Sequence, residues 1–173
     1  MACTLVSSFP IGCRASVGGI QEIKIHPMPS DATLAAQYTL TSGVVAITGA
    51  SLSGWYTLSC EKQTANLKDS ATVNVQNGTV FYTETLVYIY NQLQASFRNE
   101  LQNYAQARVQ IAVKDRNGNV WLLGYLRGLD LSAGESDSGT ADGDRSGYSL
   151  TWTGMEVSPI SSMSSANYAL LVT

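Results

Sequence analysis

The stretch Asn91-Gln-Leu-Gln-Ala-Ser-Phe-Arg-Asn-Glu-Leu-Gln-Asn-Tyr-Ala-Gln106 is the only segment of this sequence with the pattern of an amphipathic helix. Its apolar residues recur at the helical spacing of three to four, and polar residues fill the other positions. Asn91 is expected to cap the first turn, with Gln94 three residues later in the capping-box position. The apolar stripe consists of Leu93, Phe97, Leu101 and Tyr104. A single helix with one such stripe must pack on another element, which we expect to be a β-sheet.

Strand patterns separated by turn residues lie on both sides of this helix. Residues 79–90 are dense in aromatic and β-branched residues, and Asn77-Gly78 before them predicts a two-residue type I′ hairpin turn that follows a strand at 71–76. Asn117-Gly118 predicts a second hairpin of the same kind. The other strands are expected at residues 20–26, 38–40, 44–48, 55–60, 107–114, 120–127, 129–131, 148–153 and 168–173.

The order of these elements predicts a mainly β fold, an antiparallel β-sandwich or barrel with one flanking helix at about 91–106. The length of 173 residues fits a single domain. An N-terminal arm is expected at about 1–19, a polar loop at 61–70, and a flexible acidic loop at about 132–147, where no large apolar residue occurs. Residues 30–41 fit either a helical turn or a strand.

The composition favours self-association. Charged residues make up 13% of the chain, about half the usual share of roughly 25%, and mixed surface charge is what normally keeps monomers apart. An ordinary secreted β-domain with a Ser/Thr-rich surface is the alternative reading of the same numbers. The net charge of −3 and the lack of a basic run argue against a surface that binds polyanions.

Neither a signal peptide nor an apolar run of membrane-spanning length is evident in the sequence. The three cysteines are an odd number without metal-ligand spacing, so we expect reduced, buried thiols and a soluble protein of cytosolic origin. They are Cys3, Cys13 and Cys60.

Residues that enzyme sites need are sparse. His26 is the single histidine, which excludes a multi-histidine metal site, and we expect it to be a surface residue at a strand end. Gly18-Gly19 precedes a strand rather than the helix of a phosphate-binding loop. A calcium site was considered for Glu135, Asp137, Asp142 and Asp144, but their spacing does not match an EF-hand. We therefore expect no enzymatic activity, no cofactor and no metal, and we interpret the acidic segment as a solvated loop.

Four features carry a resemblance between about residues 55 and 159. They are the Asn77-Gly78 hairpin that opens a long aromatic strand, the single helix, the Asn117-Gly118 hairpin that leads to Trp121-Leu-Leu-Gly124, and the segment Gly143-Asp-Arg-Ser-Gly-Tyr-Ser-Leu-Thr-Trp-Thr-Gly-Met-Glu156 followed by Pro159. Together they resemble the tail tube proteins of tailed bacteriophages, which are related in fold to the tube protein of type VI secretion.

The resemblance implies a non-enzymatic virion protein that forms rings, expected to be hexameric, by pairing strand edges around a channel. Stacked rings would form the tail tube for DNA, which is passing cargo without sequence-specific binding. The partners would be the chain itself and other tail or connector proteins, with no membrane, and the location would be the virion tail after assembly in the host bacterial cytoplasm. The 61–70 loop is the candidate contact with a neighbouring ring. The channel is expected to be acidic, and the candidate residues are Glu84, Glu135, Asp137, Asp142 and Asp144.

Two other functions fit the same pattern. One is another virion component of similar fold, namely a head–tail adaptor, a tail terminator or a capsid decoration protein. The other is a small-ligand-binding β-barrel, which would require an apolar cavity between its strands.

Overall fold

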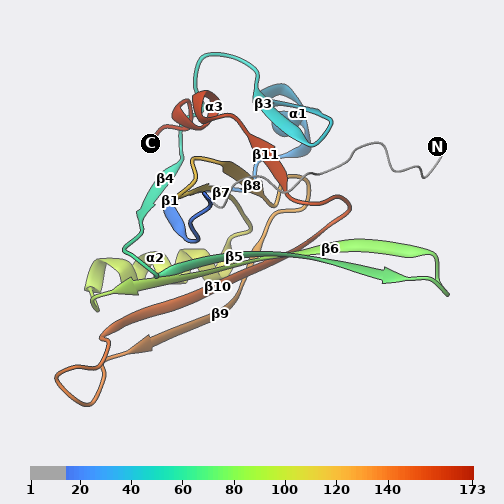
Figure 1. Ribbon diagram of the computed structural model, residues 1–173. Coiled ribbons are helices and arrows are strands. Elements are labelled where there is room, and N and C mark those ends of the chain that lie inside the picture. Colours follow the sequence, from blue (N-terminus) through green and yellow to red (C-terminus); the bar gives the residue numbers. More distant parts are fainter. Residues whose placement is uncertain (1–14) are drawn as a thin grey trace.

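The computed structural model describes residues 15–173, which form two β-sheets and three short helices (Figure 1). The larger sheet contains β1 (Ile20–Pro27), β2 (Tyr38–Thr41), β3 (Val44–Ile47), β4 (Tyr56–Ser59), β7 (Val109–Asp115), β8 (Val120–Leu123) and β11 (Ser161–Met163). The smaller sheet contains β5 (Ala65–Asn74), β6 (Thr79–Asn91), β9 (Asp130–Asp137) and β10 (Gly147–Glu156). The helices are α1 (Asp31–Gln37), α2 (Ala95–Gln106) and α3 (Ser165–Ala169).

The strand order is β2-β3-β11-β8-β7-β1-β4 in the larger sheet and β5-β6-β10-β9 in the smaller one. Neighbouring strands are antiparallel, apart from the parallel pair β3 and β11. The prediction of a mainly β, sandwich-like fold with a flanking helix is confirmed.

The main hydrophobic core lies between the two sheets. Alternate residues of β1 and β10 point into it, and their inward members, such as Ile23 and Leu150, are buried. A second core lies on the other face of the larger sheet, under α1 and α3, where Trp55 is 1% exposed. Both faces of the central strand β7 are therefore covered, which explains its continuous run of buried residues from Val109 to Val113.

The helix is shorter than the predicted 91–106. Asn91 pairs with Gly147 as the last residue of β6, so it does not cap the helix. The N-cap is Gln94, whose side chain makes no capping hydrogen bond. Leu93 lies before the helix and is 42% exposed, so it does not belong to the packed stripe. The pairing of β6 with β10 thus extends into the residues that were expected to start the helix.

Two predicted loops are in part strands. Residues 65–70 belong to β5, so the polar loop predicted at 61–70 is limited to residues before Ala65. Residues 132–137 belong to β9, and the acidic loop is limited to 138–146. Neither strand needs large side chains, because pairing with β6 and β10 satisfies its backbone groups.

The C-terminal segment also differs from its prediction. The strand expected at 168–173 is replaced by α3, which Ser164 caps by accepting a hydrogen bond from the Asn167 amide at 3.2 Å, and by a single bridge between Leu52 and Leu171. The strand expected at 120–127 ends at Leu123. The ambiguous residues 30–41 form both α1 and β2.

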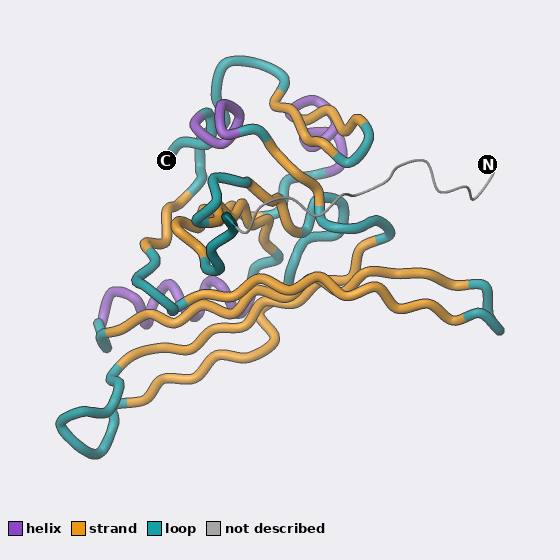
Figure 2. The backbone as a smooth tube through the Cα atoms, viewed as in Figure 1, coloured by secondary structure: helices purple, strands orange, loops and turns teal. Residues whose placement is uncertain are grey.

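The β5–β6 hairpin extends far beyond the rest of the smaller sheet (Figure 2). Its turn is a four-residue loop at 75–78, not a two-residue type I′ turn, because Asn74 pairs with Thr79 and only Gly78 has a positive φ, of 63°. All residues from 71 to 80 are exposed. We call residues 71–80 the distal hairpin.

Of the expected N-terminal arm, residues 1–14 lie outside the described residues. Residues 15–19 are exposed, and the backbone of Val17 exchanges hydrogen bonds of 2.8 and 2.9 Å with the Asn117 side chain. Among the described residues, no helix is both long and apolar enough to span a membrane.

Candidate assembly surface

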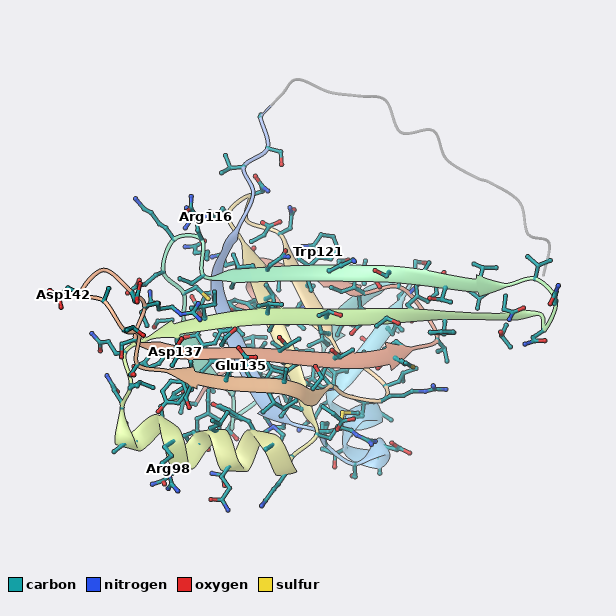
Figure 3. All side chains as sticks on the ribbon, turned by 90° about the horizontal axis from the view of Figure 1, so that it is seen from below. Arg98, Arg116, Trp121, Glu135, Asp137 and Asp142 are labelled. Carbon is teal, nitrogen blue, oxygen red and sulfur yellow. The ribbon has the colours of Figure 1, made fainter. Side chains whose placement is uncertain are left out.

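One face of the four-stranded sheet is covered by no other element of the described chain. Leu86 and Trp152 are paired across β6 and β10, and both are buried on the core side. Successive side chains of a strand point to opposite faces, so the residues next to Leu86 and Trp152 in sequence lie on the other face of the sheet. Figure 3 shows this face toward the reader. We call this surface the open face. Its central residues are Thr83, Thr85, Val87 and Ile89 of β6 and Ser149, Thr151 and Thr153 of β10.

The predicted acidic residues of the β9 region separate into three environments. Glu135 and Asp137 pair with Ser149 and Gly147, so they lie on the open face near one end of the sheet (Figure 3). Asp142 is exposed on the 138–146 loop. Asp144 accepts hydrogen bonds from the Thr140 and Ala141 amides at 3.0 and 2.8 Å, which lower the pKa of its carboxyl. Its side chain therefore organises the loop.

Glu84 does not lie on any surface of this chain, so its expected place in an acidic channel lining is wrong. Its side chain points to the core side and is 2% exposed. Its Oε2 accepts a hydrogen bond from the Gly124 amide at 2.7 Å. Burial raises the pKa of Glu84 to about 7, with a smaller contribution from the charges of Glu156 and Asp69.

Asp69, Glu84 and Glu156 form a group that we call the carboxylate anchor. Glu156 is 3% exposed, and its Oε1 accepts hydrogen bonds from the amides of Leu126 and Arg127 at 3.0 and 2.7 Å. Asp69 Oδ2 accepts one from the Ile160 amide at 3.1 Å. These bonds fix two segments that cross between the sheets, at 124–127 and 156–160.

The sequence patterns did not predict the role of Asp69 and Glu156 in this anchor. A usable signal was present, because Glu156 is in phase with the buried residues of β10 and Asp69 is in phase with the half-buried residues of β5. No group of three or more His, Cys, Asp or Glu side chains in the described part of the chain is arranged to hold a metal ion. Because its carboxylates accept backbone hydrogen bonds from both crossing segments, the anchor is interpreted as structural.

Within residues 15–173, no further strand pairs with either edge of the smaller sheet. β5 and β9 are its outermost strands, and each is hydrogen-bonded on one side only. Such edges offer backbone donors and acceptors to another strand. The larger sheet has the shorter edge strands β2 and β4. The two long edges on either side of the open face make this sheet the candidate assembly surface.

Helix α2 lies along the core side of the smaller sheet, at the left in Figure 1. Phe97 packs its ring against Tyr90 and Tyr148, with ring centroids 4.7 and 4.8 Å apart, and Tyr104 meets Trp152 edge-on at 5.8 Å. Leu101 also packs on the core. None of the helix residues is fully buried, so the helix covers the core incompletely.

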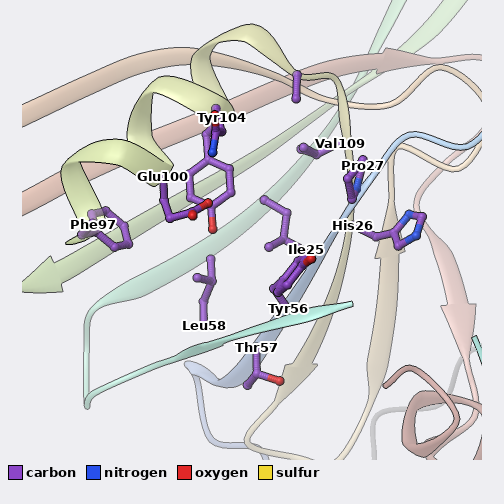
Figure 4. Close-up of a pocket in the computed structure, with 12 residues that line it drawn as sticks. Ile25, His26, Pro27, Tyr56, Thr57, Leu58, Phe97, Glu100, Tyr104 and Val109 are labelled. Atoms are coloured by element: carbon purple, nitrogen blue, oxygen red, sulfur yellow. The ribbon is translucent and has the colours of Figure 1, made fainter. Parts of the chain in front are cut away.

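The incomplete cover leaves an apolar groove between α2 and the edge strand β4 (Figure 4). Its main cavity has a volume of about 560 Å³, and a second cavity of about 470 Å³ shares four lining residues with it: Thr57, Leu58, Phe97 and Glu100. Tyr56 on the rim is 55% exposed. We call this feature the α2–β4 groove. The apolar residues that line its main cavity include Ile25, Tyr56, Leu58, Phe97, Tyr104 and Val109.

We expect Phe97→Ala to lower the free energy of unfolding by about 2 kcal/mol. This is less than the 3–5 kcal/mol typical of a fully buried phenylalanine, because one side of the ring faces the groove. Leu93→Ala, outside the helix and 42% exposed, is the control and should change stability by less than about 0.5 kcal/mol. Urea titration of both variants measures the difference, and equal losses would contradict the packing described for α2.

His26 is not the plain surface residue that was expected. Its ring stacks on Trp55 with centroids 5.1 Å apart, and partial burial lowers its pKa. Cys60 is a half-buried free thiol, and burial raises its pKa to about 11, which disfavours the reactive thiolate. Cys3 and Cys13 lie outside the described residues.

Comparisons of this chain with protein-family models, curated proteins and solved structures found no match. The function is therefore argued from the geometry of the open face, its two free edges and the α2–β4 groove.

Proposed function

We propose that this protein is a virion structural protein that assembles into rings, and that the rings stack into a phage tail tube through which DNA passes. The observation that carries the proposal is the four-stranded antiparallel sheet with an open face and two free edges. With an even number of alternating strands, β5 and β9 run in opposite directions. Copies related by rotation about an axis would therefore join β9 to the next β5 as an antiparallel pair. Closing the ring would remove both edges.

The proposed ring has room for DNA. Six copies would contribute about 24 strands, and a strand spacing of about 4.8 Å with a tilt of about 40° gives a backbone diameter on the order of 50 Å. Barrels with 16–18 strands already leave a water-filled channel. Side chains on the open face are mostly short hydroxyl and β-branched groups, which would leave much of this width free.

The chemistry of the open face suits a passing polyanion. Glu135 and Asp137 would add two negative charges to the channel, against one positive charge from Lys68, which pairs with Thr85 on the same face. Like charge repels phosphates, whereas a surface rich in lysines and arginines would hold them. This proposal gives the protein no enzymatic role and no cofactor. Its partners would be other copies of the chain and neighbouring tail or connector proteins, in a virion tail assembled in the host bacterial cytoplasm.

Size-exclusion chromatography and negative-stain electron microscopy of the purified protein test the proposal. Rings and stacked tubes are the expected result. Single rings that never stack would favour a tail terminator or a head–tail adaptor. A monodisperse monomer that retains an apolar molecule in the α2–β4 groove would contradict assembly and favour ligand binding.

Thr151→Lys should make the assembled tubes retain DNA, because it places a positive charge at the centre of the open face. Thr39→Lys is the matched control, since Thr39 is an exposed strand residue on β2 of the other sheet. Co-sedimentation with linear duplex DNA at about 50 and 200 mM salt measures retention, which should weaken at the higher salt. Equal retention by both variants would exclude the open face as the channel lining.

A further inference from the structure

The α2–β4 groove has the size and the lining of a site for a small organic molecule. Its main cavity of about 560 Å³ lies within the range of roughly 300–1,000 Å³ that is typical of small-molecule sites. Leu58 and Val109, which are buried, contribute an apolar wall. The proposed ring joins β5 to β9, so its formation does not depend on this groove.

Three aromatic rings line the groove from two elements. Phe97 and Tyr104 belong to α2, and Tyr56 belongs to β4. Tyr56 is 55% exposed, so part of its ring is free to contact a ligand. The faces of aromatic rings carry negative partial charge and attract cations. Rings from both sides of one cavity therefore favour a cation with an apolar body.

The groove carries one negative charge and no positive one. Glu100 is the only acidic residue that lines either cavity, and no lysine or arginine lines them. Glu100 forms no salt bridge with another residue of the described chain. Arg98, on the same helix, lines a separate pocket between α2 and β9. His26 adds little positive charge at neutral pH, because partial burial lowers its pKa from the usual 6.5.

The Glu100 carboxylate lies close to the aromatic rings. Figure 4 shows Glu100 and Tyr104 extending from α2 toward β4. Burial raises the pKa of Tyr104 to about 12, and the charge of Glu100 adds to this shift. Glu100 also lines both cavities, so its charge is shared by the whole groove. A cation in the main cavity would therefore meet the carboxylate and the ring faces together.

We propose that the α2–β4 groove binds a small organic cation, with a quaternary or tertiary ammonium group on an apolar body. The ammonium group contacts Glu100 and the rings of Tyr56 and Tyr104. The apolar body lies against Phe97 and Leu58. An anion would find no positive partner in this lining, and a metal ion would find one carboxylate, whereas hard cations need several oxygen ligands.

Phenyltrimethylammonium and its neutral isostere tert-butylbenzene test the charge preference of the groove. Saturation-transfer NMR on the purified protein detects both ligands whether the chain is present as subunits or as tubes, so the result does not depend on assembly. We expect the cation to bind at least about fivefold more tightly than the isostere. Equal or tighter binding of tert-butylbenzene, or no binding of the cation at millimolar concentration, overturns the proposal.

Glu100→Gln and Tyr56→Leu separate the attraction for the cation from plain apolar packing. Both side chains are exposed, so neither substitution should prevent folding. Each variant should bind phenyltrimethylammonium about fivefold more weakly and tert-butylbenzene as before. Asp31→Asn removes an exposed carboxylate from α1, on the other face of the larger sheet, and should bind both ligands like the unmodified protein. An equal loss for both ligands in Glu100→Gln and Tyr56→Leu would mean an unselective apolar groove and overturns the proposal.

Discussion

The free energy of unfolding is expected to fall by about 3 kcal/mol as the pH rises from about 4.5 to 8, because the buried Glu84 carboxyl must ionise in the folded protein. Burial raises the pKa of this group in the folded protein from 4.5 to about 7. Between these values the unfolded chain releases the proton and the folded chain retains it. The stabilisation is therefore fully present below pH 4.5 and is lost as the pH rises through about 7. A difference of about 2.5 pKa units corresponds to roughly 3 kcal/mol.

Glu84→Gln isolates this effect from other titrating groups. His26, whose pKa is lowered by burial, contributes in the opposite direction, because its stabilisation is lost as the pH falls below 6.5. Asp69 and Glu156 remain in both proteins. Glutamine keeps an oxygen that accepts the Gly124 amide but does not ionise. Urea titrations at pH 5 and pH 8 should show a smaller loss for the variant, and parallel pH profiles of the two proteins would contradict the assignment.

Local periodicity predicted the strands whose side chains divide between the core and the opposite face of their own sheet. In β1 and β10 the alternation identified the buried residues, including Ile23, Leu150 and Trp152. The same period placed Glu84 among the inward-facing positions of β6, beside Leu86. Its negative charge led to the opposite prediction, because the tail tube resemblance implies an acidic channel. Glutamate is almost never fully buried without partners. Here the Gly124 amide is such a partner, and a contact 40 residues away is not visible in a local pattern.

Sequence patterns predicted only one end of each edge strand of the smaller sheet, at 71–76 for β5 and at 129–131 for β9, and they missed β11 entirely. β5 and β9 carry many small and polar residues, such as Lys68 and Ser136, and are strands because β6 and β10 satisfy their backbone groups. The candidate assembly surface follows from the order β5-β6-β10-β9, which depends on pairing between distant segments. The composition could therefore indicate association, but not the edges through which we propose it occurs.

Gly124→Ala is expected to lower the free energy of unfolding by about 3 kcal/mol or more. Gly124 directly follows β8 and has a φ of +65°. An added Cβ would lie 2.8 Å from the Cα and 2.9 Å from the carbonyl carbon of Gly128. These are backbone atoms, so no side-chain rotation relieves the contact. The turn would have to shift as a unit, which would move the Gly124 amide away from Glu84 and disturb the pairing of Leu129 with Val109.

Gly78→Ala separates this crowding from the cost of the backbone conformation. Gly78 has nearly the same φ, +63°, but no atom lies within 4 Å of the added Cβ, so only the left-handed strain of about 1–2 kcal/mol applies. Denaturant titration of the two variants should therefore differ by at least about 1 kcal/mol. Equal losses would mean that the 124–128 turn relaxes freely. In that case the carboxylate anchor would not hold the 124–127 segment in one position. A segment that is held rigidly leaves no room for the extra carbon.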